Sequence, residues 1–137
     1  MRRFALALTA LAGVLTLAGC GAAYPDLFLL TRSGSLPGAR LTLLVNDGGT
    51  VTCNGGEEHQ LPPRLLLDAR RVATDLMEEA HDDLTLPAPP GSVLRYRLRT
   101  EEGTVTFSDV DAARRPELAP VIVFARQVAQ DVCGLAR

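Results

Sequence analysis

The strongest constraint on the fold is an alternation of apolar and polar residues on both sides of a short turn. Between positions 94 and 108 the apolar members are Leu94, Tyr96, Leu98, Val105 and Phe107. Successive side chains of a strand point to opposite faces, so this spacing predicts two strands, 93–99 and 104–108, that share one apolar face. Glu101-Glu102-Gly103 between them predicts the turn of an antiparallel hairpin. An apolar strand face must be covered by a second layer, which restricts the chain to a layered fold.

A second hairpin is predicted closer to the N-terminus. Residues 41–45 and 50–53 flank Asn46-Asp47-Gly48-Gly49, whose residue types tolerate the positive φ angles of tight hairpin turns. The apolar run 26–31 is bounded by Pro on one side and Ser-Gly on the other, and it predicts a buried strand before this hairpin. Residues 32–38 (RSGSLPG), which follow this strand, are predicted to form a loop.

Two amphipathic helices are predicted. The first is expected to open at Leu61-Pro62-Pro63, because proline fits the first helical turn, and to end before the Pro-rich segment 86–91. Its apolar stripe is Leu65, Ala69, Val72, Ala73, Leu76 and Ala80. The second is expected over 116–132, beginning near Pro116 or Glu117 so that Pro120 lies in its first turn. Its stripe is Leu118, Val121, Ile122, Ala125, Val128, Ala129 and Val132.

The predicted order of elements is therefore β-β-β-α-β-β-α. Because the strands form hairpins and the helices are able to cover one face, we predict an α+β fold with two layers, an antiparallel sheet and two helices. Residues 26–137 have the length of a single domain.

The N-terminal segment 1–19 is typical of an export signal. Arg2 and Arg3 precede an uncharged apolar run, 4–17, which is shorter than the ~20 residues of a membrane-spanning helix. The run ends in Leu17-Ala18-Gly19-Cys20, which resembles the lipobox of bacterial lipoproteins. The resemblance implies cleavage before Cys20, attachment of diacylglycerol and acyl chains such as palmitate, and an anchor on the extracytoplasmic face of the cell membrane. The alternatives are an ordinary signal peptide with a chance cysteine, or a buried core helix.

Residues 20–25 would then be the lipidated cysteine and a short tether. Gly21 to Pro25 span at most ~18 Å, which would keep the domain close to the membrane. Cys53 and Cys133 would lie in an oxidising compartment, so we expect them to form a disulfide, with two free thiols as the alternative. Neither has a Cys or His neighbour at ligand spacing, so no metal site is expected there.

The charge balance argues against a nucleic-acid partner. The chain carries 14 basic and 16 acidic side chains, a net charge of −2 at pH 7. Loss of Arg2 and Arg3 with the export signal would make the net charge −4. Nucleic-acid binding calls for a strongly basic face, which this balance does not favour.

Five short motifs together point to a known family. They are residues 30–38 (LTRSGSLPG), 61–63 (LPP), 86–91 (LPAPPG), 95–98 (RYRL) and 115–120 (RPELAP). The set resembles emfourin-type proteins, small proteinaceous inhibitors of thermolysin-like metallopeptidases. The resemblance covers roughly residues 27–129, which is most of the predicted domain. The resemblance implies a non-catalytic domain that binds a secreted metallopeptidase. Ser35 in place of a glycine, Pro37 within the loop, the cysteine pair and the export signal depart from the family pattern.

The loop in the first motif is the candidate partner-binding site. Its residues are Arg32, Ser33, Gly34, Ser35, Leu36, Pro37 and Gly38. Pro37 restricts the backbone and the two glycines permit tight turns, so we expect a rigid loop. Leu36 is the expected contact with an apolar subsite of the partner, although a single exposed leucine is ordinary on a protein surface.

No arrangement of residues indicates catalysis. HExxH, GxSxG, P-loop and dinucleotide-binding motifs do not occur. Glu78 and His81 are spaced to share a metal on a helix face, but a histidine at the negative end of a helix is the simpler explanation. Ser108-Asp109-Val110-Asp111 offers too few ligands for calcium and is more typical of a loop that opens a helix. We expect no catalytic residue, no metal, no cofactor and no enzymatic activity.

Arg95, Arg97 and Arg99 form a basic stripe on one strand. Near a membrane it would meet anionic head groups at roughly 1 kcal/mol per charge, or it would remain a solvated face paired with acidic residues. The sequence as a whole favours a lipid-anchored extracytoplasmic binding domain with a role like that of a protease inhibitor. The alternative is a structural or envelope-docking lipoprotein without a discrete protein partner.

Overall fold

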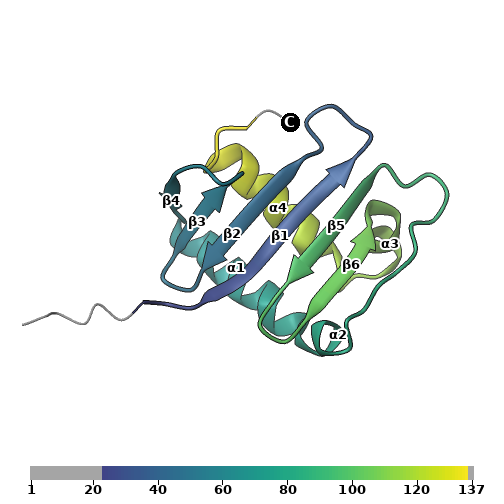
Figure 1. Ribbon diagram of the computed structural model, residues 1–137, viewed down its shortest axis with the longest axis horizontal. Coiled ribbons are helices and arrows are strands. Elements are labelled where there is room, and N and C mark those ends of the chain that lie inside the picture. Colours follow the sequence, from purple (N-terminus) through teal and green to yellow (C-terminus); the bar gives the residue numbers. More distant parts are fainter. Residues whose placement is uncertain (1–22, 136–137) are drawn as a thin grey trace, which may run out of the picture.

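The sheet is built around the central strand β1 (Asp26–Gly34). The structure, a computed structural model, describes residues 23–135. β1 pairs with β2 (Leu41–Asn46) on one side and with β5 (Leu94–Arg99) on the other. β3 (Thr50–Cys53) and β4 (Glu58–Gln60) extend the sheet beyond β2, and β6 (Thr104–Ser108) extends it beyond β5. The strands stand in the order β4-β3-β2-β1-β5-β6, and every neighbouring pair is antiparallel (Figure 1).

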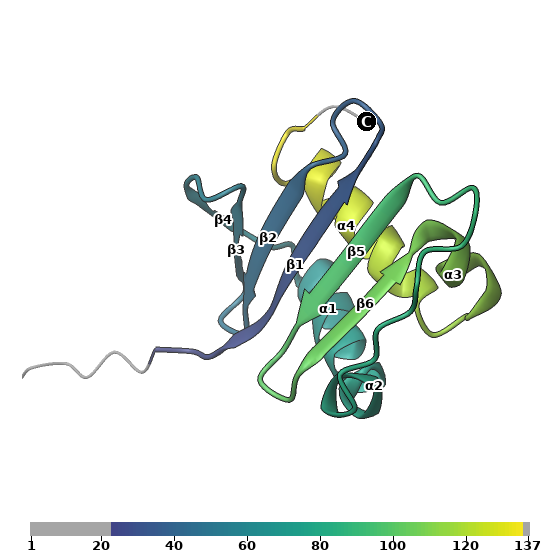
Figure 2. The same ribbon diagram turned by 45° about the vertical axis from the view of Figure 1, so that its right-hand side comes forward.

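Helices cover one face of this sheet. α1 (Pro63–Asp75) and α4 (Ala119–Asp131) pack against each other and lie on the same side of the strands in both views (Figures 1 and 2). Two short helices, α2 (Met77–His81) and α3 (Asp109–Arg114), follow α1 and β6 in the chain. The predicted α+β class, an antiparallel sheet with a helical layer, is confirmed.

The core lies between the sheet and the helices. Four of the residues predicted to face inward from the β5–β6 hairpin are fully buried: Tyr96, Leu98, Val105 and Phe107. Phe28 of β1 packs edge-on against Phe124 of α4, with ring centroids 5.6 Å apart. Such aromatic pairs contribute ~0.5–1.5 kcal/mol beyond the burial of their area. The Phe28–Phe124 contact therefore joins the central strand directly to α4.

β1 continues into the segment that the sequence assigns to a loop. Gly34 pairs with Leu94 of β5 and is the last residue of the strand. A Cβ atom at position 34 would overlap with the carbonyl oxygen of Val93, so glycine alone permits this close approach of the two backbones. The loop that follows therefore begins at Ser35, later than predicted.

Several other element boundaries differ from the sequence prediction. β4 forms between the predicted hairpin and the first helix, where the sequence analysis predicted no strand, and it pairs with β3. The predicted first helix is divided at Leu76 into α1 and α2. The last helix begins at Ala119, later than expected, with Pro120 in its first turn as proposed.

At 108–111, where the sequence analysis predicted a loop that opens a helix, the helix α3 begins immediately after Ser108. The Ser108 hydroxyl accepts a hydrogen bond from the Asp111 N–H at 3.1 Å. The Asp111 carboxylate in turn accepts one from the Ser108 N–H at 2.8 Å. This reciprocal pair is a capping box, which satisfies two backbone donors that the first helical turn leaves free.

Cys53 and Cys133 form a disulfide, with Cα atoms 6.0 Å apart. This separation is within the usual range for a disulfide. The bond links the end of β3 to the residues that follow α4, 80 positions later in the chain.

Replacing both cysteines with serine should destabilise the domain without abolishing its fold. On the chain-entropy model, closing a loop of about 80 residues stabilises by up to ~4–5 kcal/mol, while the core packs without the bond. We expect an unchanged circular dichroism spectrum at room temperature and a lower melting temperature. Each single variant should lose the bond as completely as the double variant does. A double variant that melts at the parental temperature would contradict this prediction.

Candidate binding site

Residues 35–40, the β1–β2 loop, lie at the end of the sheet opposite to the start of β1 (Figures 1 and 2). The predicted contact residues Ser35, Leu36, Pro37 and Gly38 belong to this loop, whereas Arg32, Ser33 and Gly34 belong to β1. Positions 33–38 are all exposed. Leu36 is 48% exposed, so its side chain is available to a partner and is not part of the core.

The tip of the loop is a tight turn. The Ala39 N–H donates a hydrogen bond to the Leu36 carbonyl at 3.0 Å. Gly38 has a φ of 73°, a backbone conformation that glycine adopts without strain. A proline followed by a glycine of positive φ is the pattern of a type II turn, so Pro37 and Gly38 account for the chain reversal.

Arg32 braces the loop from the strand below it. Its Nε donates to the Ala39 carbonyl at 2.8 Å and its Nη2 donates to the Gly38 carbonyl at 3.1 Å. The Ser35 N–H donates to the Val93 carbonyl at 3.2 Å, which ties the loop to the start of β5. Hydrogen bonds from charged donors contribute ~1.5–3 kcal/mol. The loop is therefore held at both ends, and Leu36 has less backbone freedom to lose on binding.

Arg32 also lies opposite Tyr96 in the pairing of β1 with β5. Burial raises the pKa of the Tyr96 hydroxyl, while the positive charge of Arg32 acts in the opposite direction. The net effect is a raised pKa, so the hydroxyl is protonated at neutral pH. Tyr96 consequently offers no negative charge to offset the guanidinium of Arg32.

The predicted arginine stripe is not uniformly solvated. Arg95 is half-buried and its Nη2 donates to the Leu86 carbonyl at 2.8 Å. Its Nη1 is buried and has no hydrogen-bond partner among residues 23–135. The cause is the segment 84–86, which runs along β6. Arg97 and Arg99 remain exposed, so the stripe of three predicted charges is reduced to two.

The other predicted site residues do not converge on one place. His81 and Glu78 are exposed on α2. In the described part of the chain, no group of three or more His, Cys, Asp or Glu side chains is arranged to hold a metal ion. Asp111 is engaged in the cap of α3. Cys20, the predicted lipidation site, lies outside the described residues.

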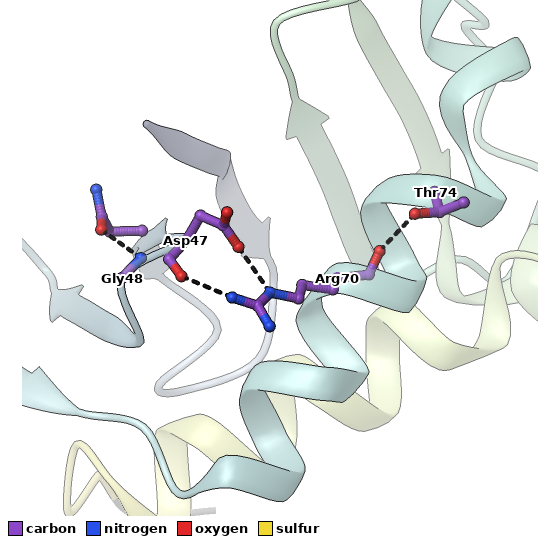
Figure 3. A network of polar contacts seen from close by, with 5 residues as sticks. Asp47, Gly48, Arg70 and Thr74 are labelled. Carbon is purple, nitrogen blue, oxygen red and sulfur yellow. Dashed lines mark hydrogen bonds and ion pairs between the residues drawn. The ribbon is translucent and has the colours of Figure 1, made fainter. Parts of the chain in front are cut away.

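Tyr24 and Pro25, which were assigned to the predicted tether, are hydrogen-bonded to the domain. The Asn46 side chain donates to the Tyr24 carbonyl at 2.7 Å, and the Asp47 N–H donates to the Pro25 carbonyl at 2.9 Å. The Asp47 carboxylate also forms an ion pair with Arg70 of α1 at 2.7 Å (Figure 3). The chain is thus attached from Tyr24 onward to the β2–β3 turn, which is itself linked to the helical layer.

Comparison with protein-family models, curated proteins and solved structures finds no match to this chain. Between residues 23 and 135, no helix has the length and apolar content needed to cross a membrane.

The sequence analysis predicted a loop after β1 but did not predict the hydrogen bonds that hold it. It assigned Arg32 to partner contact, whereas the structure uses this side chain as the brace, and it did not single out Val93 as the anchor of Ser35. A usable signal was present, because extending the alternation of Phe28 and Leu30 by two residues places Arg32 on the inner face of the sheet.

Substituting Arg32 with glutamine should loosen the loop. The change removes both hydrogen bonds from the guanidinium to the Gly38 and Ala39 carbonyls. We expect the Ala39 amide to exchange with solvent at least ~10-fold faster, equivalent to ~1.4 kcal/mol, as measured by NMR hydrogen exchange. The matched control Arg97→Gln alters an exposed arginine on the other face of the sheet and should leave this rate unchanged. Equal Ala39 rates in Arg32→Gln and the parent would rule out the brace.

Proposed function

We propose that this chain is a lipid-anchored extracytoplasmic protein whose domain binds a protein partner through the β1–β2 loop. The observation that carries this proposal is the half-exposed Leu36 on a loop held by Arg32 and by the start of β5. An exposed apolar side chain on a rigid loop binds with a small ordering cost. The domain acts by binding, and no residue of the chain is assigned to chemistry.

The two ends of β1 support this arrangement. Cys20 precedes Tyr24 by four positions, so a lipidated Cys20 would lie within ~14 Å of Tyr24, which is hydrogen-bonded to Asn46 beside the β2–β3 turn. From there β1 runs for nine residues, about 25–30 Å, to the β1–β2 loop. The loop would therefore lie at the end of the domain farther from the membrane, where a soluble partner has access to it.

The proposed partner is a secreted metallopeptidase. This choice follows from the resemblance of residues 30–38 and four further motifs to emfourin-type inhibitors. Leu36 would fill an apolar subsite of the peptidase cleft, while the sheet behind the loop supports it. Burying one leucine contributes ~1.5–3 kcal/mol, which corresponds to about a ten- to hundredfold change in affinity.

Substituting Cys20 with alanine should abolish lipid anchoring. The parent protein, recovered from membranes, should have the intact mass of residues 20–137 plus two or three acyl chains. The Cys20→Ala variant should be unprocessed or should appear in the soluble fraction without lipid. Cys53→Ser is the matched control and should retain the lipid. A processed parent protein without acyl chains on Cys20 would refute the anchor.

The inhibitor proposal is tested with the chain from Gly21 onward, because the buried core residues all lie between Phe28 and Ala129. This domain should inhibit at least one member of a panel of secreted metallopeptidases. Leu36→Asp should weaken inhibition at least tenfold, since a carboxylate cannot enter an apolar subsite without a large desolvation cost. Arg97→Ala, on the outer face of the sheet, should change it little.

Absence of inhibition across the panel would remove the peptidase as partner. Affinity capture from detergent-solubilised envelopes then distinguishes the remaining possibilities. A discrete protein that is captured by the parent and lost with Leu36→Asp supports the binding loop. Capture of no discrete protein favours the structural or envelope-docking alternative.

A further inference from the structure

A cavity of about 600 Å³ opens beside the β1–β2 loop, between the end of the sheet and α4. Arg32 and Tyr96 line it from the strands, and Ile122 and Arg126 line it from the helix. Its volume is within the range of ~300–1,000 Å³ that is typical of small-molecule sites. The proposed contact through Leu36 makes no use of this cavity.

The polar lining carries positive charge only. Arg32 and Arg126 contribute two guanidinium groups, and no acidic residue lines the cavity. Within residues 23–135, Arg126 takes part in no ion pair of 4.0 Å or shorter. Gln127 and Gln130 add neutral amides on the same helix. Like charges that share a cavity produce a local positive potential, which attracts an anion.

Asp109, an acidic residue near Tyr96, already accepts hydrogen bonds from the backbone. Asp109 is close enough to affect the pKa of Tyr96, which its negative charge raises, although burial is the larger cause of that shift. Its carboxylate accepts hydrogen bonds from the Val93 N–H at 3.2 Å and the Leu94 N–H at 3.3 Å. Asp109 does not line the cavity and the Tyr96 hydroxyl is neutral, so the lining contains no negative charge to offset the two arginines.

One of the two cationic groups is held in place before any ligand arrives. The bonds from Arg32 to the Gly38 and Ala39 carbonyls fix its guanidinium on the strand. Arg126 is exposed on α4 and is free to turn toward a ligand. A site with a fixed arginine loses less side-chain freedom on binding than one with two mobile arginines.

The remaining lining is apolar, with Leu94 and Ile122 as its larger aliphatic members. A simple inorganic anion would satisfy the arginines and leave these side chains in contact with water. A purely apolar molecule would cover Leu94 and Ile122 but would desolvate the guanidinium groups without pairing them. Both parts of the lining are satisfied by a molecule that has an anionic group and an apolar body.

We propose that this cavity binds a small amphipathic organic anion. Arg126 and Arg32 hold its oxyanion group, a carboxylate or a phosphate, while its apolar body lies against Leu94 and Ile122. The proposal is independent of the anchor and of the peptidase partner.

The test is calorimetric titration of the oxidised domain from Gly21 onward with octanoate and with octyl phosphate, both below their micelle concentrations. Inorganic phosphate and 1-octanol are the matched ligands that lack the apolar body or the charge. We expect at least one amphiphile to bind at least tenfold more tightly than both of these. Whichever of octanoate and octyl phosphate binds with the lower Kd identifies the preferred oxyanion.

Arg126→Gln should weaken binding of that amphiphile at least tenfold, and Arg97→Gln should leave it unchanged. Both variants alter exposed arginines, so they should retain the parental melting temperature. The proposal is overturned if neither amphiphile binds at millimolar concentration, or if inorganic phosphate or octanol binds as tightly as both amphiphiles. It is also overturned if Arg126→Gln binds as well as the parent protein.

Discussion

The register of β1 is the constraint on which the rest of the structure depends. Phe28, Leu30 and Arg32 alternate along this strand and share its inner face. The register that packs Phe28 against Phe124 of α4 therefore also directs Arg32 inward at the end of the strand. A shift of one residue would expose both apolar side chains and turn Arg32 to the open face. The same register of β1 is therefore required for packing of the core and for the inward position of Arg32.

Arg32 connects the β1–β2 loop with the cavity next to α4, although the loop and α4 are far apart in the sequence. On one side it holds the Gly38 and Ala39 carbonyls of the loop, and on the other it lines the cavity next to α4. An anion in the cavity would act on the same guanidinium that orders the loop. If an anion binds there, occupancy of the cavity and order of the loop would be linked, and by thermodynamic reciprocity each would affect the other equally.

The class of the fold was predictable because its signals are local. A period of two in the strands and of 3.6 in the helices determines which side chains face the core. The extension of β1 to Gly34 was not predictable, since it depends on how closely the backbone of Val93, just before the distant strand β5, approaches. The partial burial of Arg95 likewise depends on the return of segment 84–86 along β6. The loop was visible in its Pro37-Gly38 signature, whereas the cavity exists only once α4 lies across the sheet.

The Cys53–Cys133 bond closes a covalent ring that contains all four described helices and the β5–β6 hairpin. A single peptide-bond cleavage within this ring, for example in the Pro-rich segment 86–91, opens the ring but releases no fragment. The two pieces stay tethered at a high effective concentration, so the broken contacts re-form within one molecule. Strands β1, β2 and β3 as far as Thr52 lie outside the ring on one continuous piece of chain. A domain that meets proteases in its own compartment would thereby keep its shape after being nicked once.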